Sequence, residues 1–455
     1  MDLQDNEVSG TIPTEIGTLA ELTFLNVAEN KLRGSLPSEL GILTDLSHLA
    51  VFANHLTGPL PKELERLVSL THLSLGNNSL TGTLPAVMLS AMIDLGVLSL
   101  SNNELTGSLP PDHWNLAALT YLSAYSNHLT GTIPAALGDL FRLTHLNLYD
   151  NTLNGPVPSV RLAAMVDMEF LALSKNQLTG LIPSELGTLT ALTYLSAYSN
   201  HFNGTLPLTS EMIADMTELE FLELGDNQFT GLLPSELGTL VALTYLSVYS
   251  NHLTGTIPKE LGGLSQLSRL NLYDNALNGP VPSGMLAAMI DMEYLALSKN
   301  QLTGLLPTEI GVLTALTSLF ADSNGFSGTL PKQMAELVKL NHISLQKNEL
   351  NGTIPTELGL LTKLTYLDFS ENLFTGHLPT EMGLLTALIV LNLFENQLTG
   401  TIPAEFGSLT NLYTFGLEDN KLTGMVPSSI CNLDLTEFSV DCELACACLN
   451  CPCAQ

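Results

Sequence analysis

LTYLSAYSNHLTGTIP, residues 119–134, returns almost unchanged from Leu192 and again from Leu243, with both tyrosines kept each time. The stretch follows a wider pattern, LxxLxLxxNxLxGxIP, that runs through the chain. Aligning on its asparagine gives eighteen copies, at Asn6, Asn30, Asn54, Asn78, Asn103, Asn127, Asn151, Asn176, Asn200, Asn227, Asn251, Asn275, Asn300, Asn324, Asn348, Asn372, Asn396 and Asn420. Neighbouring copies are 24 residues apart, with three spacings of 25 and one of 27.

This period and this leucine pattern are typical of a leucine-rich repeat solenoid. The sequence therefore predicts an α/β solenoid, a right-handed superhelix with a parallel concave β-sheet, over residues 1–430. The LxL alternation places two leucines inward, as a strand requires. The asparagine can satisfy backbone groups where the chain leaves the strand. The PxELGxL segment, as in 183–189, should form a short helical turn on the outer side.

Stacked repeats need protection at both ends, because one repeat cannot bury its apolar face alone. All six cysteines lie in the last 25 residues, at Cys431, Cys442, Cys446, Cys448, Cys451 and Cys453. We interpret residues 431–455 as a disulfide-bonded cap formed in an oxidising compartment. A thiolate metal cluster on CACLNCPC is the rival interpretation. At the other end Met1 already lies inside a repeat without a cap, so we expect an upstream leader, cap or membrane anchor.

Composition excludes several classes of partner. The formal charge is −30, from 45 acidic residues against 15 Lys plus Arg. Nucleic acid and anionic membranes require clustered basic residues, which this chain lacks. No apolar run is long enough to span a membrane. Three sequons, at Asn77, Asn203 and Asn351, agree with a secreted protein and predict glycosylation.

Strand alternation also predicts the concave surface. Ten of the eleven tyrosines take the outward phase and are the candidate ligand-binding residues: Tyr121, Tyr125, Tyr149, Tyr194, Tyr198, Tyr245, Tyr249, Tyr273, Tyr294 and Tyr366. Several phenylalanines and histidines share this phase, and acidic residues outnumber basic ones there. Rigid aromatics with polar tips suit recognition of a peptide, protein or glycan. Equally, aromatic residues on adjacent strands can stack simply to stabilise the sheet.

Other candidate sites have simpler structural interpretations. His48 and His72 should be neighbours, but with no third ligand they favour a ladder over a metal site. Four Met-rich outer segments, beginning near residues 86, 159, 208 and 283, favour fuller helical turns over a binding groove. Catalytic and cofactor motifs are absent, so we predict a protein that is not an enzyme and needs neither metal nor cofactor.

A higher-order repeat lies above the 24-residue period. Residues 146–187 match residues 270–311 at an offset of 124, as if a block of five repeats had been copied whole. The tyrosines at 121 and 245 share this offset. Duplication therefore accounts for part of the tyrosine repetition, whether or not it is used in binding.

The full consensus LxxLxxLxLxxNxLxGxIPxxLGxL, seen from Leu189 to Pro207 and in nearly every repeat, resembles the plant-specific class of leucine-rich repeats. That class occurs in receptor-like kinases, receptor-like proteins and polygalacturonase-inhibiting proteins, whose inner face commonly binds peptides, proteins or glycans. The chain departs from it by lacking the paired-cysteine amino-terminal cap and a kinase domain. Its cysteine cluster is similar to caps of diatom leucine-rich-repeat proteins.

The resemblance implies an extracellular recognition module, secreted or part of a receptor-like ectodomain at the plasma membrane, that binds a protein, peptide or glycan partner on its concave face. The alternative is a structural or adhesive wall-associated protein, with ice or mineral binding as a remote variant.

Overall fold

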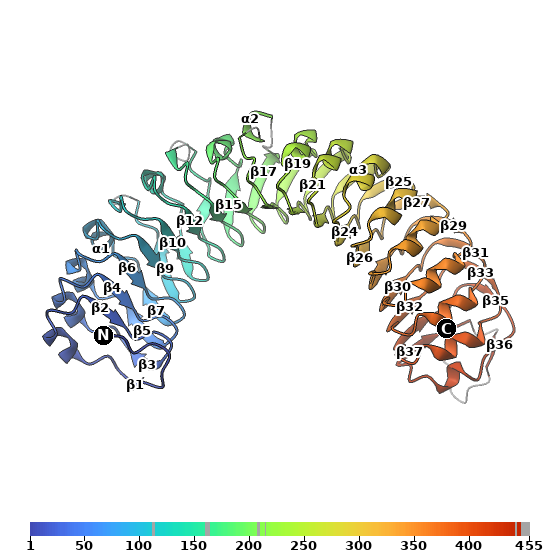
Figure 1. Ribbon diagram of the computed structural model, residues 1–455, viewed down its shortest axis with the longest axis horizontal. Coiled ribbons are helices and arrows are strands. Elements are labelled where there is room, and N and C mark those ends of the chain that lie inside the picture. The colour runs from blue at the N-terminus through green and yellow to red at the C-terminus, as the bar shows by residue number, and fades with distance from the viewer. Residues whose placement is uncertain (112–113, 160–163, 207–209, 214, 442–443, 447–455) are drawn as a thin grey trace. The chain divides into compact units, whose positions relative to one another are not determined.

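The computed structural model describes residues 1–111, 114–159, 164–206, 210–213, 215–441 and 444–446. The chain separates into two compact units, residues 1–229 (unit 1) and residues 230–455 (unit 2). In each unit the chain winds through successive turns of one strand, a loop, a second strand and an outer helix, as Figure 1 shows. The predicted solenoid of leucine-rich repeats is confirmed.

The first row of strands comes from the LxL segments and forms an open parallel ladder on the concave side of each unit (Figure 1). In unit 1 it contains β2 (Phe24–Asn26), β4 (His48–Ala50), β6 (His72–Ser74), β8 (Val97–Ser99), β10 (Tyr121–Ser123), β12 (His145–Asn147), β14 (Phe170–Ala172), β16 (Tyr194–Ser196) and β18 (Phe221–Glu223). In unit 2 it contains β20 (Tyr245–Ser247), β22 (Arg269–Asn271), β24 (Tyr294–Ala296), β26 (Ser318–Phe320), β28 (His342–Ser344), β30 (Tyr366–Asp368), β32 (Val390–Asn392), β34 (Thr414–Gly416) and β37 (Glu437–Ser439).

A second row of parallel strands follows the asparagines, and the sequence did not predict it. In unit 1 these strands are β1 (Ser9–Gly10), β3 (Lys31–Gly34), β5 (His55–Pro59), β7 (Ser79–Gly82), β9 (Glu104–Ser108), β11 (His128–Thr130), β13 (Asn154–Gly155), β15 (Gln177–Gly180) and β17 (His201–Thr205). From residue 228 onward they are β19 (Gln228–Leu232), β21 (His252–Thr256), β23 (Ala276–Gly279), β25 (Gln301–Leu305), β27 (Gly325–Gly328), β29 (Glu349–Gly352), β31 (Leu373–His377), β33 (Gln397–Gly400) and β35 (Lys421–Leu422). Glycine and proline here favour a turn, but pairing between successive repeats overrides this local preference.

Short helices lie on the outer side of both units (Figure 1). The 3-10 helices are η1 (Thr14–Thr18), η2 (Ser38–Ile42), η3 (Lys62–Arg66), η4 (Ala135–Asp139), η6 (Ser184–Thr188), η7 (Ser235–Thr239), η8 (Lys259–Gly263), η9 (Thr308–Val312), η10 (Lys332–Glu336), η11 (Thr356–Leu360), η12 (Thr380–Leu384), η13 (Ala404–Ser408) and η14 (Ile430–Asn432). Three Met-rich segments form α-helices instead, α1 (Ala86–Ala91), α2 (Ser210–Ile213) and α3 (Ser283–Ala288). Their methionines, such as Met88 and Met285, are fully buried, so they fill the core.

The asparagines hold each turn together. Asn176 donates from Nδ2 to the carbonyls of Leu148 (2.9 Å), Leu173 (3.1 Å) and Ser174 (3.2 Å). Its Oδ1 accepts a hydrogen bond from the backbone N–H of Leu153 at 3.0 Å. The asparagine therefore satisfies backbone groups of its own repeat and of the preceding one, as predicted.

Two positions of each turn adopt left-handed backbone conformations. The glycine four residues after the asparagine does so in all eighteen repeats, for example Gly180 at φ 82°. The residue just before the asparagine does so as well, although none of these eighteen is glycine. Lys175 and Lys299, at φ 50° and 51°, are examples. This backbone conformation turns the side chains before the asparagines away from the strand.

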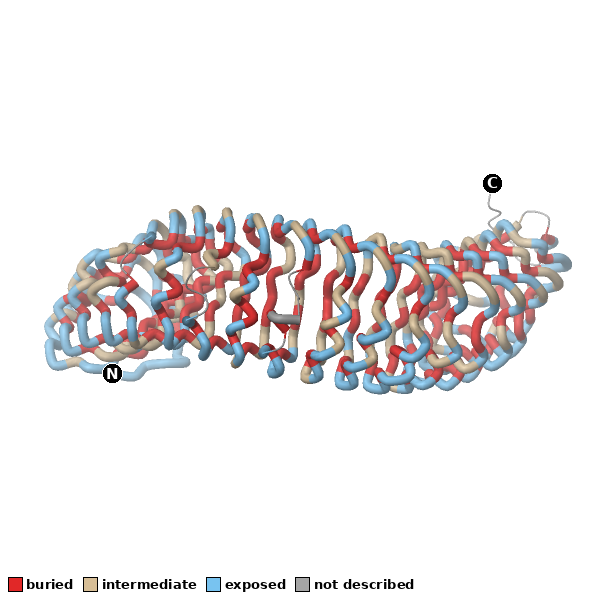
Figure 2. Tube along the Cα trace, turned by 90° about the horizontal axis from the view of Figure 1, so that it is seen from above, coloured by how far each residue is buried: buried red, intermediate tan, exposed pale blue. Residues whose placement is uncertain are grey.

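Leucines fill the interior of each turn, so buried and exposed segments alternate along the chain (Figure 2). The repeat at residues 103–127 replaces the usual outer segment, and there Trp114 is 5% exposed and donates from Nε1 to the Pro110 carbonyl at 2.7 Å. This contact supports local packing for the tryptophan. The described part of the carboxyl-terminal segment adds β37, which pairs in parallel with β34, and β38 (Ala445–Cys446), which pairs with β36 (Met425–Val426).

Candidate functional site: the concave face

Outward-facing side chains of the first row form two columns on the concave face of each unit. We call the first residue of each strand column A and the residue four positions later column B. Column A contains the predicted Tyr121, Tyr194, Tyr245, Tyr294 and Tyr366, and column B contains Tyr125, Tyr149, Tyr198, Tyr249 and Tyr273. Tyr121 is 36% exposed and the other nine are half-buried. Tyr413, as expected, precedes β34 and belongs to neither column.

Column A of unit 1 is a stack of rings. Register pairs Tyr121 with His145, His145 with Phe170 and Phe170 with Tyr194. Ring centroids are 5.7, 5.9 and 4.3 Å apart along this series, and Tyr194 lies 4.3 Å from Phe221. The last two pairs are nearly parallel, with interplanar angles of 11° and 10°. Stacked rings cover one another's faces, so they present edges and polar tips to a ligand.

Column A of unit 2 is interrupted. Arg269 occupies the place between Tyr245 and Tyr294, and Ser318 follows Tyr294. Stacking resumes where His342 lies 4.1 Å from Tyr366 at an interplanar angle of 3°. Phe320, two residues beyond column A, contacts both Tyr294 (5.4 Å) and His342 (4.5 Å).

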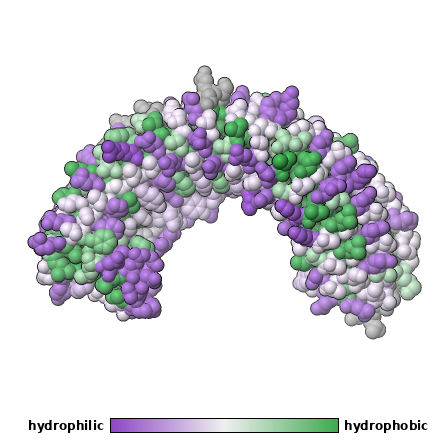
Figure 3. All heavy atoms as spheres, in the orientation of Figure 1, coloured by the Kyte–Doolittle hydropathy of each residue, from purple (hydrophilic) through white to green (hydrophobic). Residues whose placement is uncertain are grey.

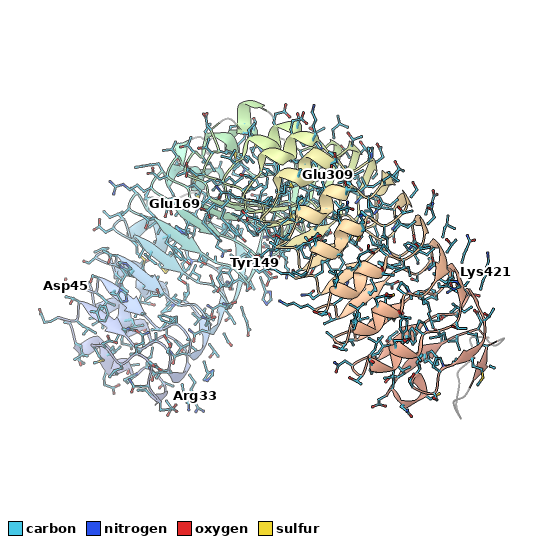
Figure 4. All side chains as sticks on the ribbon, turned by 45° about the vertical axis from the view of Figure 1, so that its right-hand side comes forward. Arg33, Asp45, Tyr149, Glu169, Glu309 and Lys421 are labelled. Carbon is cyan, nitrogen blue, oxygen red and sulfur yellow. The ribbon has the colours of Figure 1, made fainter. Side chains whose placement is uncertain are left out.

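Column B carries a tyrosine–lysine pair in each unit. In unit 1, Lys175 Nζ lies 5.2 Å from the centre of the Tyr149 ring, and the Tyr198 hydroxyl donates to the Tyr149 hydroxyl at 3.4 Å. Figure 4 shows Tyr149 on the concave side, opposite the helices. In unit 2, Lys299 Nζ lies 5.1 Å from the Tyr273 ring. Cations near tyrosine faces place a positive charge in an otherwise acidic surface.

On the concave face of unit 2, acidic groups lie close to His342 and Tyr366. Asp368, only 5% exposed, accepts hydrogen bonds from Ser370 Oγ (2.6 Å) and Asn392 Nδ2 (3.0 Å). Asp322 accepts from Ser344 Oγ at 3.1 Å and from Ser298 Oγ. These bonds hold both carboxylates in the sheet surface beside the ring of His342.

Burial and these carboxylates shift several titrating groups. Burial, followed by the charge and hydrogen bond of Asp368, raises the pKa of Tyr366 to about 12. Burial also raises the pKa of Tyr194 and of Tyr294. Burial lowers the pKa of His342, although Asp322 and Asp368 act in the opposite direction. With these raised pKa values, Tyr194, Tyr294 and Tyr366 keep their phenol protons at neutral pH and can donate hydrogen bonds.

The predicted histidine pair is a ladder contact. His48 and His72 face each other in register, with ring centroids 5.2 Å apart, and His48 stacks on Phe24 at 4.5 Å. Burial, and then the charge of His72, lowers the pKa of His48. Within the part of the chain that the structure describes, no three His, Cys, Asp or Glu side chains are grouped so that they could hold a metal ion.

Among the remaining predicted residues, Asn77 lies close to column B, because its Oδ1 accepts a hydrogen bond at 2.7 Å from Asn102 Nδ2, which also donates to the Tyr125 hydroxyl at 3.1 Å. Asn77, Asn203 and Asn351 are exposed, the last two in second-row strands β17 and β29. Cys431 is disulfide-bonded. Cys442, Cys448, Cys451 and Cys453 lie outside the described residues, as does the Cys446 side chain, so the cap over residues 431–455 stays a prediction. Among the described residues, no helix has the length and hydrophobicity that crossing a membrane requires.

Sequence reasoning missed the tyrosine–lysine pairs and the serine–aspartate network. The 124-residue duplication held a signal for the first, because it repeats Lys175 as Lys299 beside equivalent tyrosines. It could not reveal their contact, since the left-handed backbone before each asparagine decides where the lysines point.

Comparisons with known proteins identify the family. A model described as Leucine Rich Repeat matches residues 69–90, 94–116, 118–140, 167–189, 218–240, 242–264, 363–385 and 387–409. No curated protein matches the sequence.

Solved structures give close likenesses. The plant peptide hormone receptor RGFR1, in complex with RGF2, is 32% identical with a TM-score of 0.87, covering 97% of this chain and 74% of its own. The Arabidopsis receptor kinase HAESA, in complex with the peptide hormone IDA and the co-receptor SERK1, is 34% identical with a TM-score of 0.84, covering 95% and 75%. The Leptospira interrogans LRR protein LIC12759 is 30% identical with a TM-score of 0.66, covering 92% and 95%. With its repeats, its parallel ladders and these likenesses, the chain belongs to the leucine-rich-repeat proteins of the plant type.

Proposed function

We propose that the chain is an extracellular recognition module that binds a peptide or protein partner on its concave face, as a secreted protein or a receptor-like ectodomain. The observation that carries this proposal is the pair of columns. Their phenol tips and hydroxyl-rich, acidic surroundings lie on one face of each unit. The similarity to RGFR1 and HAESA, both solved with peptide hormones, supports a binding rather than a catalytic role.

Charge favours a partner with basic side chains. The chain carries a formal charge of −30, and acidic groups such as Asp322 and Asp274 lie beside the columns. Opposite charge accelerates encounter and selects among partners more than it adds affinity. Glycan ligands are a variant of the same proposal, since hydroxyl-rich surfaces also suit sugars.

A quadruple substitution tests the proposal. Tyr121, Tyr125, Tyr194 and Tyr198, all in unit 1, are changed to serine in the intact secreted chain, which is then used in a pull-down and a glycan-array screen. We expect partner capture by the unchanged chain and its loss in the variant. Tyr413→Ser is the matched control, because this tyrosine is 50% exposed and lies outside both columns. Capture that survives the quadruple change contradicts the proposal.

A structural or adhesive wall-associated protein is the second candidate, and the ring stack of unit 1 favours it. Rings 4.3 Å apart cover one another and stabilise the sheet without a ligand. If this is their main role, the quadruple variant will lose stability while its retention on isolated cell walls is unchanged.

A further inference from the structure

Three leucines on the second-row side of the chain are exposed in one recurring pose. Leu181 is 63% exposed, Leu232 66% and Leu305 64%. Figure 3 shows hydrophobic patches among hydrophilic residues on the face of the molecule that it draws. Each of the three leucines lies over a glycine of the next repeat. A Cβ added to Gly204 would meet Leu181 Cδ2 at 2.4 Å, and one added to Gly255 would meet Leu232 Cδ2 at 2.4 Å.

Two of these leucines border equivalent grooves, one in each unit. The Leu181 groove, about 430 Å³, is lined by Pro156, Leu181, Pro183 and Thr205 among others. The Leu232 groove, about 590 Å³, is lined at the matching positions by Pro234 and Thr256. Both grooves expose apolar surface that would be more stable if covered.

The grooves differ at the residue beside the covered glycine. Asn203, Gly204 and Thr205 form a sequon, and Asn203 is exposed in β17 while Thr205 lines the groove. In unit 2 the corresponding residues are Thr254, Gly255 and Thr256, which is no sequon. The sequon at Asn351 has no such leucine, because Thr329 lies over Gly352 in its place.

We propose that an N-linked glycan on Asn203 folds back onto the Leu181 groove and covers it. Thr179 and Gly180 pair with His201 and Phe202, so Leu181 and Asn203 are the next residues along these two neighbouring segments. The C–H faces of the first sugars can pack on the Leu181 side chain while their hydroxyls stay in water. This proposal rests on the extracellular location given under the proposed function. It assigns an occupant to the Leu181 groove, which is not part of the concave columns.

The test uses the full chain, secreted from eukaryotic cells behind an added leader. Glycan occupancy is measured by mass spectrometry, and the rate of endoglycosidase release is followed site by site under native conditions. We expect release from Asn203 to be about threefold or more slower than from Asn351, because a covered glycan is released only when it lifts off.

Matched variants test whether contact with the groove is what slows glycan release. Leu181→Ser should bring the Asn203 release rate to that of Asn351 without unfolding the chain, since the leucine is largely exposed. Thr254→Asn creates a sequon beside Leu232, and its glycan should also be released slowly until Leu232→Ser is added. An unoccupied Asn203, equal release rates in the unchanged chain, or slow release that persists in Leu181→Ser would each overturn the inference. Partner capture on the concave face is measured on the same samples, so failure of the proposed function is seen separately.

Discussion

Residues 146–187 of unit 1 and 270–311 of unit 2 are copies of one block, yet the concave face differs at the positions that flank this block. The tyrosine–lysine pair of column B is kept, with distances of 5.2 and 5.1 Å. Within the block, column A keeps a ring, Phe170 in unit 1 and Tyr294 in unit 2, whereas His145 and Tyr194 on either side correspond to Arg269 and Ser318. The strand register is nevertheless the same in both copies, with residues 145–147 paired to 170–172 and residues 269–271 paired to 294–296.

The comparison teaches that the rings do not define the sheet. Leucines and asparagines occupy equivalent places in the two copies, and the register is the same although Arg269 stands where unit 1 has the ring of His145. Column A therefore differs between the two copies over an unchanged register, and a fold can carry different sites on the same scaffold in this way.

The largest expected loss of stability comes from replacing the asparagine that holds the turn in each copy. Asn176→Ala in unit 1 removes three donated hydrogen bonds and leaves the Leu153 N–H unpaired, and Asn300→Ala in unit 2 does the same to the Leu277 N–H. We expect each to lower the free energy of unfolding by about 3 kcal/mol, measured by urea denaturation. Hydrogen exchange at these two amides should accelerate locally.

Thr179→Ala, at an exposed position of β15, is the control and should change little. A much smaller loss for one asparagine than for the other would show that the two frames are not equivalent.

Serine substitutions in column A should lower the free energy of unfolding by less than the asparagine substitutions do, and by different amounts in the two units. Phe170→Ser removes a ring that lies between His145 and Tyr194, whereas Tyr294→Ser removes one that contacts Phe320 at a 46° tilt and faces Arg269 on the other side. Counting cross-strand ring pairs, we expect losses of about 1.5 kcal/mol for Phe170→Ser and about half of that for Tyr294→Ser. Urea unfolding of both variants measures the difference. Equal losses would mean that stacking is not what distinguishes the columns.

The raised pKa of Tyr366, in unit 2, should make the stability of the chain fall at alkaline pH. Because the folded-state pKa of Tyr366 is raised to about 12 from 10.0, the folded chain holds the phenol proton more tightly than the unfolded chain. Its contribution to stability is complete below pH 10 and disappears as the pH rises toward 12. Tyr194 and Tyr294 also have raised pKa values, but only Tyr366 is expected to ionise near pH 12. Absorbance titration should show this last step, and Tyr366→Phe should remove it. Loss of the late step in Tyr121→Phe instead would place the shifted group in the wrong unit.

The smallest effect concerns the pair that both copies retain. Lys175→Met and Lys299→Met remove exposed ammonium groups from tyrosine faces, and exposed contacts of this kind are weak. We expect each variant to keep its thermal midpoint within about 1 °C, with the two variants alike. Lys421→Met, remote from any ring contact among the described residues, is the control. A clear drop in only one unit would show that the copies have diverged in column B too.

The sequence by itself determined the repeat frame and the phase of the concave face. Leu122 and Leu195 had to point inward and Tyr121 and Tyr194 outward, because a strand alternates its side chains and water excludes the leucines. The outer helical turns and the role of asparagines such as Asn176 followed from the same local rules.

Only the tertiary structure decided what depends on neighbouring repeats. Three features join residues of different turns: the second strand row, the contact of Lys175 with Tyr149, and the position of Leu181 over Gly204. The raised pKa of Tyr366 likewise depends on burial, followed by the nearby charge and hydrogen bond of Asp368. Periodicity states which residues recur, but distances between stacked turns depend on backbone geometry and side-chain packing, which no single repeat contains.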